Sequence, residues 1–120
     1  MHNGSSRERL EAAPVLDIRT YRLVPGAAPT FDRIFRDEAL PLLQGAGIQV
    51  VAYGISLIDG ADYALIRSFP SLRLRNEQLE AFYGSELWRT RFDERVEALI
   101  ESFQVAVIAA PSTWADADAS

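Results

Sequence analysis

Residues 16–26, LDIRTYRLVPG, constrain the fold of this chain more than any other stretch. They predict a β-strand that carries polar side chains, ends at Pro25-Gly26 and is followed directly by a helical pattern. This strand opens a strand–helix–strand–strand–helix–strand order that fills the rest of the domain. The order predicts a ferredoxin-like βαββαβ fold of the α+β class, with one antiparallel four-stranded sheet and the helices on one face.

Hydrophobic patterns and turn signals place the individual strands. Short apolar runs with alternating side chains are typical of strands whose two faces have different neighbours. Asp59-Gly60 stands between two β-rich runs and predicts a hairpin turn. The expected strands cover residues 15–23, 49–58, 62–69 and 104–109.

Apolar residues at helical spacing predict the helices between these strands. The first covers residues 30–44, and Pro41 inside it predicts a kink or a break, because proline has no backbone N–H. The second is capped by Ser71 and runs to about Tyr83. The third is capped by Ser85, with an expected buried face of Trp88, Phe92, Val96, Leu99 and Ile100.

The length of 120 residues predicts one domain, over residues 15–110. Residues 1–14 form a polar leader that we expect to be disordered, and residues 111–120 form an acidic tail. No apolar run has the roughly 18 residues that a membrane span needs, and the leader lacks the apolar segment of a signal peptide. The sequence therefore predicts a cytoplasmic protein without membrane association.

The composition excludes several classes of chemistry. The chain has no cysteine, and its single histidine, His2, lies in the leader. Thiolate catalysis, Ser-His triads and the usual zinc or haem ligands are thus absent from the folded part, which predicts no metal and no cofactor. The net charge of −5 without a basic cluster argues against nucleic-acid binding.

The expected sheet has apolar residues on both faces, which predicts a partner. Residues 49–58 and 104–109 place apolar side chains on either side of their strands. Helices cover only one face of a ferredoxin-like sheet, and an apolar second face must also be covered. Another copy of the chain is the simplest cover, so we expect a homodimer through face-to-face sheets.

Several short motifs resemble the NIPSNAP family. Each is weak alone, but their order and spacing extend from about residue 16 to residue 109, nearly the whole expected domain. They are Leu16-x-Ile18-Arg19-Thr20-Tyr21-x-Leu23-x-Pro25-Gly26, Ala39-Leu40-Pro41-Leu42-Leu43, Gly47-Ile48, Phe69-x-Ser71-Leu72-x-x-Arg75 and Trp88.

The resemblance implies a dimeric α+β barrel, in which two ferredoxin-like sheets pack together. Small monooxygenases, polyketide cyclases, muconolactone isomerases and haem-degrading enzymes are similar in fold. NIPSNAP proteins share no settled reaction, so the resemblance implies a fold and leaves the chemistry to the residues of this chain.

Arg19 and Tyr21 are the first candidate site residues, because alternation places them on one face of the first strand together with Asp17. In one reading these side chains line a cavity between the sheet and the helices, where Arg19 would pair with a ligand carboxylate or enolate. In the other, Arg19 and Asp17 make ion pairs across the dimer interface. For Asp17 we favour the interface pair.

Glu38 is the candidate proton-transfer group. It lies seven residues after Phe31 and four after Ile34, on the apolar stripe of the first helix. Partial desolvation there would raise the pKa of its carboxyl group toward the range of a general base. The alternatives are a place at the edge of the stripe or an ion pair with an arginine.

Four further residues complete the candidate site. Arg67 interrupts an apolar strand. It is expected to be either a ligand clamp or half of a buried or interface ion pair. Tyr53 is a candidate hydrogen-bond donor to the substrate. Trp88 and Phe92 would wall an apolar cavity, although side chains of this kind more often form plain core.

Two functions are therefore open. The first is a small-molecule-binding protein for an apolar, aromatic or polyketide-like compound, which as an enzyme would be a metal-free and cofactor-free isomerase, cyclase or monooxygenase. Glu38 would transfer the proton, and Arg19 or Arg67 would stabilise an oxyanion or enolate. The second is a non-enzymatic dimeric scaffold, ligand carrier or interaction module. An open cavity with convergent polar groups separates the first from the second.

Overall fold

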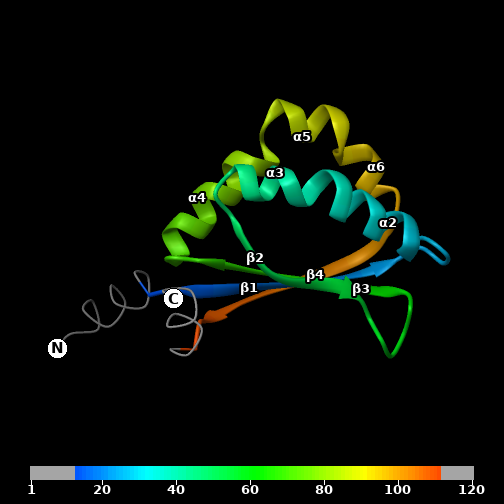
Figure 1. Ribbon diagram of the computed structural model, residues 1–120, viewed down its shortest axis with the longest axis horizontal. Helices are drawn as coiled ribbons and strands as arrows, with labels where there is room; N and C mark the ends of the chain where they lie inside the picture. Colours follow the sequence, from blue (N-terminus) through cyan, green and yellow to red (C-terminus); the bar gives the residue numbers. More distant parts are fainter. Residues whose placement is uncertain (1–12, 112–120) are drawn as a thin grey trace.

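The computed structural model describes residues 13–111, and its order of elements confirms the ferredoxin-like α+β fold (Figure 1). The four strands form one antiparallel sheet in the order β2-β3-β1-β4. The expected leader and acidic tail lie outside the described residues, apart from Ala13, Pro14 and Pro111. The strands are β1 (Val15–Leu23), β2 (Gln49–Ile55), β3 (Asp62–Phe69) and β4 (Ile100–Ala109).

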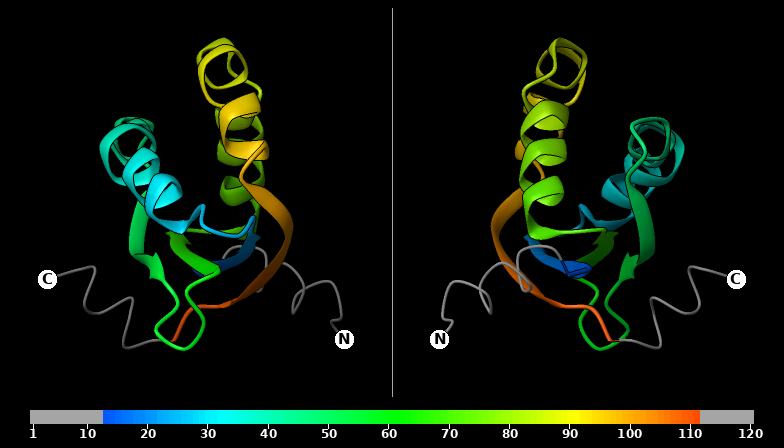
Figure 2. Two further views of the ribbon diagram at one scale, coloured as in Figure 1. Left: turned by 90° about the vertical axis from the view of Figure 1, so that its right-hand side faces the viewer. Right: turned by 90° about the vertical axis from the view of Figure 1, so that its left-hand side faces the viewer.

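The helices form two arms that stand on one face of the sheet (Figure 2). The first arm, between β1 and β2, consists of α2 (Ala28–Ile34), η1 (Phe35–Ala39) and α3 (Leu40–Gly45). The second arm, between β3 and β4, consists of α4 (Leu72–Tyr83), α5 (Glu86–Arg91) and α6 (Asp93–Glu97). No helix within residues 13–111 is long and apolar enough to cross a membrane.

The irregularity predicted at Pro41 takes the form of a π turn. In η1 the N–H of Leu40 donates to the carbonyl oxygen of Phe35, five residues earlier, whereas an α-helix joins residues four apart. Pro41 follows at once and donates no hydrogen bond. The first arm therefore continues through the proline without a break, but one extra residue in its turn changes which side chains face the sheet.

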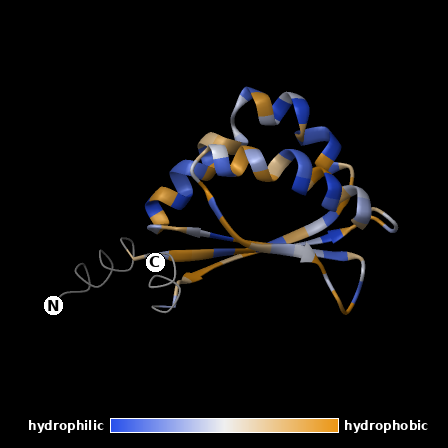
Figure 3. Cartoon of the chain, in the orientation of Figure 1, coloured by the Kyte–Doolittle hydropathy of each residue, from blue (hydrophilic) through white to orange (hydrophobic). Residues whose placement is uncertain are grey.

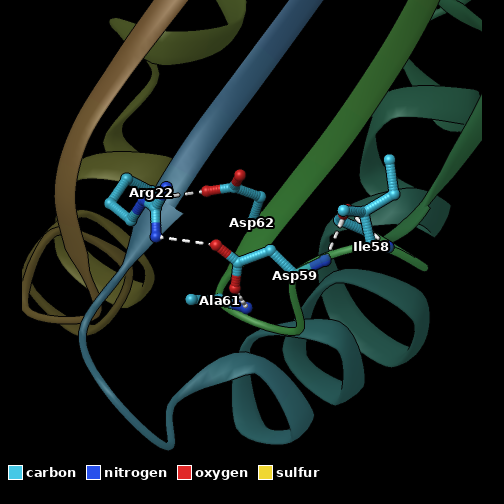
Figure 4. Close-up of polar contacts among 6 residues, drawn as sticks. Arg22, Ile58, Asp59, Ala61 and Asp62 are labelled. Carbon is cyan, nitrogen blue, oxygen red and sulfur yellow. Dashed lines mark hydrogen bonds and ion pairs between the residues drawn. The ribbon is translucent and has the colours of Figure 1, made fainter.

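The hairpin between β2 and β3 is longer than a two-residue turn. β2 ends at Ile55 instead of residue 58, and the Asp59 carboxylate accepts a hydrogen bond from the N–H of Ala61. Arg22 of β1 holds this loop through ion pairs to Asp59 (3.0 Å) and Asp62 (2.9 Å) (Figure 4). The apolar tip of the loop is fully exposed (Figure 3); it consists of Leu57 and Ile58.

The end of the second arm also differs from the expectation. α6 stops at Glu97, so Leu99 and Ile100 do not extend its helical face. β4 begins at Ile100, four residues before the predicted start, and pairs with β1 from there. The N–H of Val24 donates to the carbonyl oxygen of Leu99 at 2.9 Å, which ties the chain to the sheet edge at this point.

The core lies between the arms and the sheet. On β1 and β3 the side chains that face the helices are buried, except for the partly buried Arg19, as strand alternation requires. They pack against Phe31, Phe35 and Leu43 of the first arm and Leu79 and Phe82 of the second. None of the described helices covers the opposite face, where Ile18 and Ile66 are paired across β1 and β3.

A buried ion cluster joins the second arm to the centre of the sheet. Asp17 of β1 and Arg67 of β3 have fully buried side chains, and their Oδ1 and Nη2 atoms lie 3.1 Å apart. Arg75 of α4 reaches the other carboxylate oxygen at 2.8 Å. Arg67 also donates through Nη1 to the hydroxyl of Tyr83, at the end of α4 (2.8 Å). Asp17 thus pairs within its own chain, and the expected ion pair across a dimer interface was wrong.

Replacement of the Asp17 carboxylate should destabilise the fold strongly. Asp17→Asn leaves Arg67 buried without a counter-charge, and breaking a buried pair in this way costs about 3–5 kcal/mol. Asp37→Asn is the matched control, since Asp37 is exposed on η1 and should change stability by no more than about 0.5 kcal/mol. Urea unfolding measures both free energies; a loss below about 1 kcal/mol for Asp17→Asn would show that the cluster does not anchor the fold.

Candidate functional site

An open cavity of about 480 Å³ lies between the two arms, above β1 and β4. We call it the helical cleft. Its floor includes Arg19, Tyr21 and Leu65, and its walls are largely aromatic and aliphatic. The first arm contributes Phe31, Ile34, Phe35, Ala39 and Leu43, the second arm contributes Phe82, Tyr83, Trp88 and Val96, and Ile100 and Phe103 belong to β4.

Arg19 lies in the floor of the helical cleft between two aromatic rings. Its guanidinium carbon is 5.5 Å from the ring centroid of Tyr83 and 5.5 Å from that of Phe103. Its Nε atom is buried and has no hydrogen-bond partner. None of the ion pairs within residues 13–111 includes Arg19. Within the described residues, the floor therefore holds a cation that contacts two aromatic rings and the Tyr21 side chain but no carboxylate.

Tyr21 lies beside Arg19, two residues further along β1 and on the same face. Burial raises the pKa of Tyr21 to about 12, the nearby Tyr83 acts in the same direction, and the Arg19 guanidinium opposes both. The phenol is consequently neutral near pH 7 and keeps its proton. Arg19 and Tyr21 together offer a cation and an O–H donor to one region of the helical cleft.

The mouth of the helical cleft has the opposite charge. Asp93, Glu97 and Glu101 line it, and all three are exposed. Among the residues that line the cavity, Arg19 is the single basic one. Within the described part of the chain, no three histidine, cysteine or acidic side chains gather in a way that could hold a metal ion.

Glu38 forms the ion pair with an arginine that was one of its two alternatives, and the expectation of a raised pKa for its carboxyl group was wrong. The π turn shifts the buried stripe of the first arm from residue 38 to residue 39. Its buried positions are Ala28, Phe31, Ile34, Phe35, Ala39 and Leu43. Glu38 makes two hydrogen bonds with Arg95 of α6, at 3.0 and 2.8 Å, and so joins the two arms. The hydrogen bonds from Arg95 lower the pKa of its carboxyl group instead of raising it.

Three other predicted residues also lie away from the cavity. Arg67 is half of the buried ion cluster beneath α4 and is not free to clamp a ligand. Tyr53 packs against Phe35 with ring centroids 5.0 Å apart and is partly exposed on β2. Phe92 is buried behind Trp88, stacked on it at 5.2 Å. Of the seven predicted side chains, Arg19, Tyr21 and Trp88 line the helical cleft.

The sequence analysis missed the two rings that flank Arg19. Phe103 of β4 is paired with Tyr21 of β1, so both side chains lie on the same face of the sheet. The predicted strand began at residue 104 and therefore did not include Phe103. Tyr83 marked the expected end of α4, but nothing in its local sequence indicates that its ring reaches β1.

Comparisons with known proteins agree with this fold. The family model described as NIPSNAP matches residues 16–114. A NIPSNAP family protein of unknown function from Agrobacterium tumefaciens is 26% identical, with a TM-score of 0.74 over 82% of this chain and 89% of that one. An uncharacterised NIPSNAP-like domain protein from Burkholderia xenovorans is 16% identical, with a TM-score of 0.77 over 84% and 88%.

A more distant solved structure extends the likeness in fold. A proposed antibiotic biosynthesis monooxygenase from Caulobacter crescentus is 14% identical, with a TM-score of 0.66 over 88% of this chain and 97% of that one. At this identity the likeness concerns the fold alone. A search of the curated proteins found no match.

Proposed function

The chain belongs to the NIPSNAP family, and we propose that it is a small-molecule-binding protein whose apolar ligand occupies the helical cleft. The observation that carries this proposal is the open volume of about 480 Å³ between the arms. Binding sites for small molecules are typically concave, mostly apolar and supplied with a few polar groups, and their volumes are about 300–1,000 Å³. A purely structural domain would fill this space with side chains.

The aromatic walls favour a flat apolar ligand. Trp88 contacts Phe82 and Tyr83 with centroid distances of 5.3 and 5.1 Å, and these three rings form one side of the helical cleft. Phe31 contacts Tyr21 at 5.2 Å on the other side. Rings at such distances offer faces and edges on which a further ring can stack.

Catalysis without a cofactor is the second candidate function. The neighbouring positions of Arg19 and Tyr21 in the cavity favour it. A guanidinium and a neutral phenol side by side can stabilise a developing enolate oxygen, as isomerase, cyclase and monooxygenase chemistry on such substrates requires. Proton transfer by Glu38 is no longer part of this hypothesis, because Glu38 is paired with Arg95 outside the cavity. Loss of turnover in Tyr21→Phe, with ligand binding retained, would distinguish the enzyme from a carrier.

We further propose that the protein is a homodimer through the face of the sheet that the helices leave open. Ile18 pairs with Ile66 and with Ala106, which places apolar side chains of β1, β3 and β4 together at its centre. A second copy presents the same surface, and two-fold symmetric association buries both at once.

Binding in the helical cleft can be tested with N-phenyl-1-naphthylamine, a neutral apolar fluorophore. In a Trp114→Phe background Trp88 is the only indole of the chain, so energy transfer from Trp88 reports binding near it. The probe should saturate at one molecule per chain. Ala39→Phe places a ring in the cavity and should weaken binding about tenfold, which corresponds to about 1.4 kcal/mol.

The matched control for that measurement is Ala81→Phe, which places the same ring on an exposed position of α4. Its affinity for the probe should equal that of the parent. Equal affinities in all three proteins would locate the probe elsewhere and would remove the support for a ligand in the cavity.

The dimer can be tested by light scattering at micromolar concentration. We expect a mass of two chains for the parent and of one chain for Ile66→Arg, because the charge would lie at the centre of the open sheet face. Leu74→Arg, on an exposed position of α4, should remain a dimer. A monomeric parent would contradict the proposed association.

A further inference from the structure

We infer that the ligand of the helical cleft is an apolar monoanion, such as an aromatic monocarboxylate or a stabilised enolate, with its acidic group on Arg19 and its apolar end toward the mouth. This inference rests on the proposed function, because it names the class of molecule that the same cavity would bind. It follows from the charges of the floor and the mouth, which differ in sign.

The floor of the helical cleft holds a positive charge, that of Arg19, with no carboxylate paired to it among the described residues. Asp17 is the nearest buried carboxylate on β1, and both its oxygen atoms are already paired with Arg67 and Arg75. Because two arginines share that one carboxylate, neither of its oxygen atoms is free to pair with Arg19. Arg19 is partly buried and its Nε atom is buried without a hydrogen-bond partner, which is unfavourable for a polar group. An anionic ligand would supply the charge that the described residues do not.

The guanidinium of Arg19 lies over the rings of Tyr83 and Phe103, and the Tyr83 hydroxyl is itself fixed by Arg67. Aromatic faces attract the guanidinium but give its N–H donors no oxygen acceptor. A carboxylate accepts two parallel hydrogen bonds from a guanidinium. The phenol of Tyr21 can add a third donor from the same face of β1.

The mouth of the helical cleft is negatively charged. Asp93, Glu97 and Glu101 line the side of the cavity that is open to solvent. A ligand whose acid lies on Arg19 brings its other end close to these carboxylates. A second negative charge there would be repelled, whereas an apolar group, a hydroxyl or an amine would not. The cavity should therefore prefer monoanions over both neutral molecules and dianions.

A matched series of naphthalenes tests this preference by displacement of N-phenyl-1-naphthylamine. Naphthalene-2-carboxylate, naphthalene-2-carboxamide and naphthalene-2,6-dicarboxylate share one ring system and differ in charge. The monocarboxylate should displace the probe at a concentration about tenfold lower than the amide. The dicarboxylate should be weaker than the monocarboxylate by about threefold or more.

Arg19→Gln should abolish the preference for the monocarboxylate over the amide, which is the ratio of two displacement concentrations measured on the same variant. Arg73→Gln removes the same charge from an exposed position on α4 and should keep the preference. The comparison of the three naphthalenes on the parent protein does not depend on the folding of either variant.

The outcomes separate the inference from the proposed function. If the probe binds but the amide and the carboxylate displace it equally, the ligand is not an anion and the inference fails while the binding function stands. A preference that persists in Arg19→Gln would likewise overturn the role of Arg19. If the probe does not bind to the parent protein at all, the proposed function fails, and the inference fails with it.

Discussion

The carboxylate of Asp17 is the interaction on which the rest of this structure depends. It lies in the centre of the sheet and holds Arg67 of β3 and Arg75 of α4, so it fixes the second arm against the strands. Arg67 in turn holds the hydroxyl of Tyr83, and the guanidinium of Arg19 lies over the ring of Tyr83. One buried acid thus sets the position of the cation that gives the helical cleft its polarity.

The separation of the two arms gives the domain a cavity instead of a closed core. The first arm packs its stripe of aromatic and small residues on the sheet, and the second arm is anchored at its start by the ion cluster. The two arms meet through the pair Glu38–Arg95, which lies at the surface and stabilises only weakly. Between them the sheet carries Arg19 and Tyr21, two polar side chains that a small domain has no structural reason to place there.

Local patterns in the sequence predicted the fold well and the site only in part. Alternation along residues 15–23 placed Asp17, Arg19 and Tyr21 on one face, because a strand has a strict period of two. The prediction for Glu38 failed because it assumed 3.6 residues per turn through a segment where a π turn adds one residue. The positions of the Arg67 and Tyr83 side chains depend on contacts between elements that are far apart in the chain. Such contacts cannot be predicted from a local sequence pattern.

The central claim is that an apolar anion lies between the arms with its charge on Arg19. A crystal structure of the protein with naphthalene-2-carboxylate tests it most directly. The account predicts the carboxylate about 2.7–2.9 Å from the guanidinium nitrogens of Arg19, with the rings against the aromatic walls near Trp88. A naphthalene bound on the open face of the sheet, or one in the cavity with its carboxylate turned toward the solvent, would contradict the account.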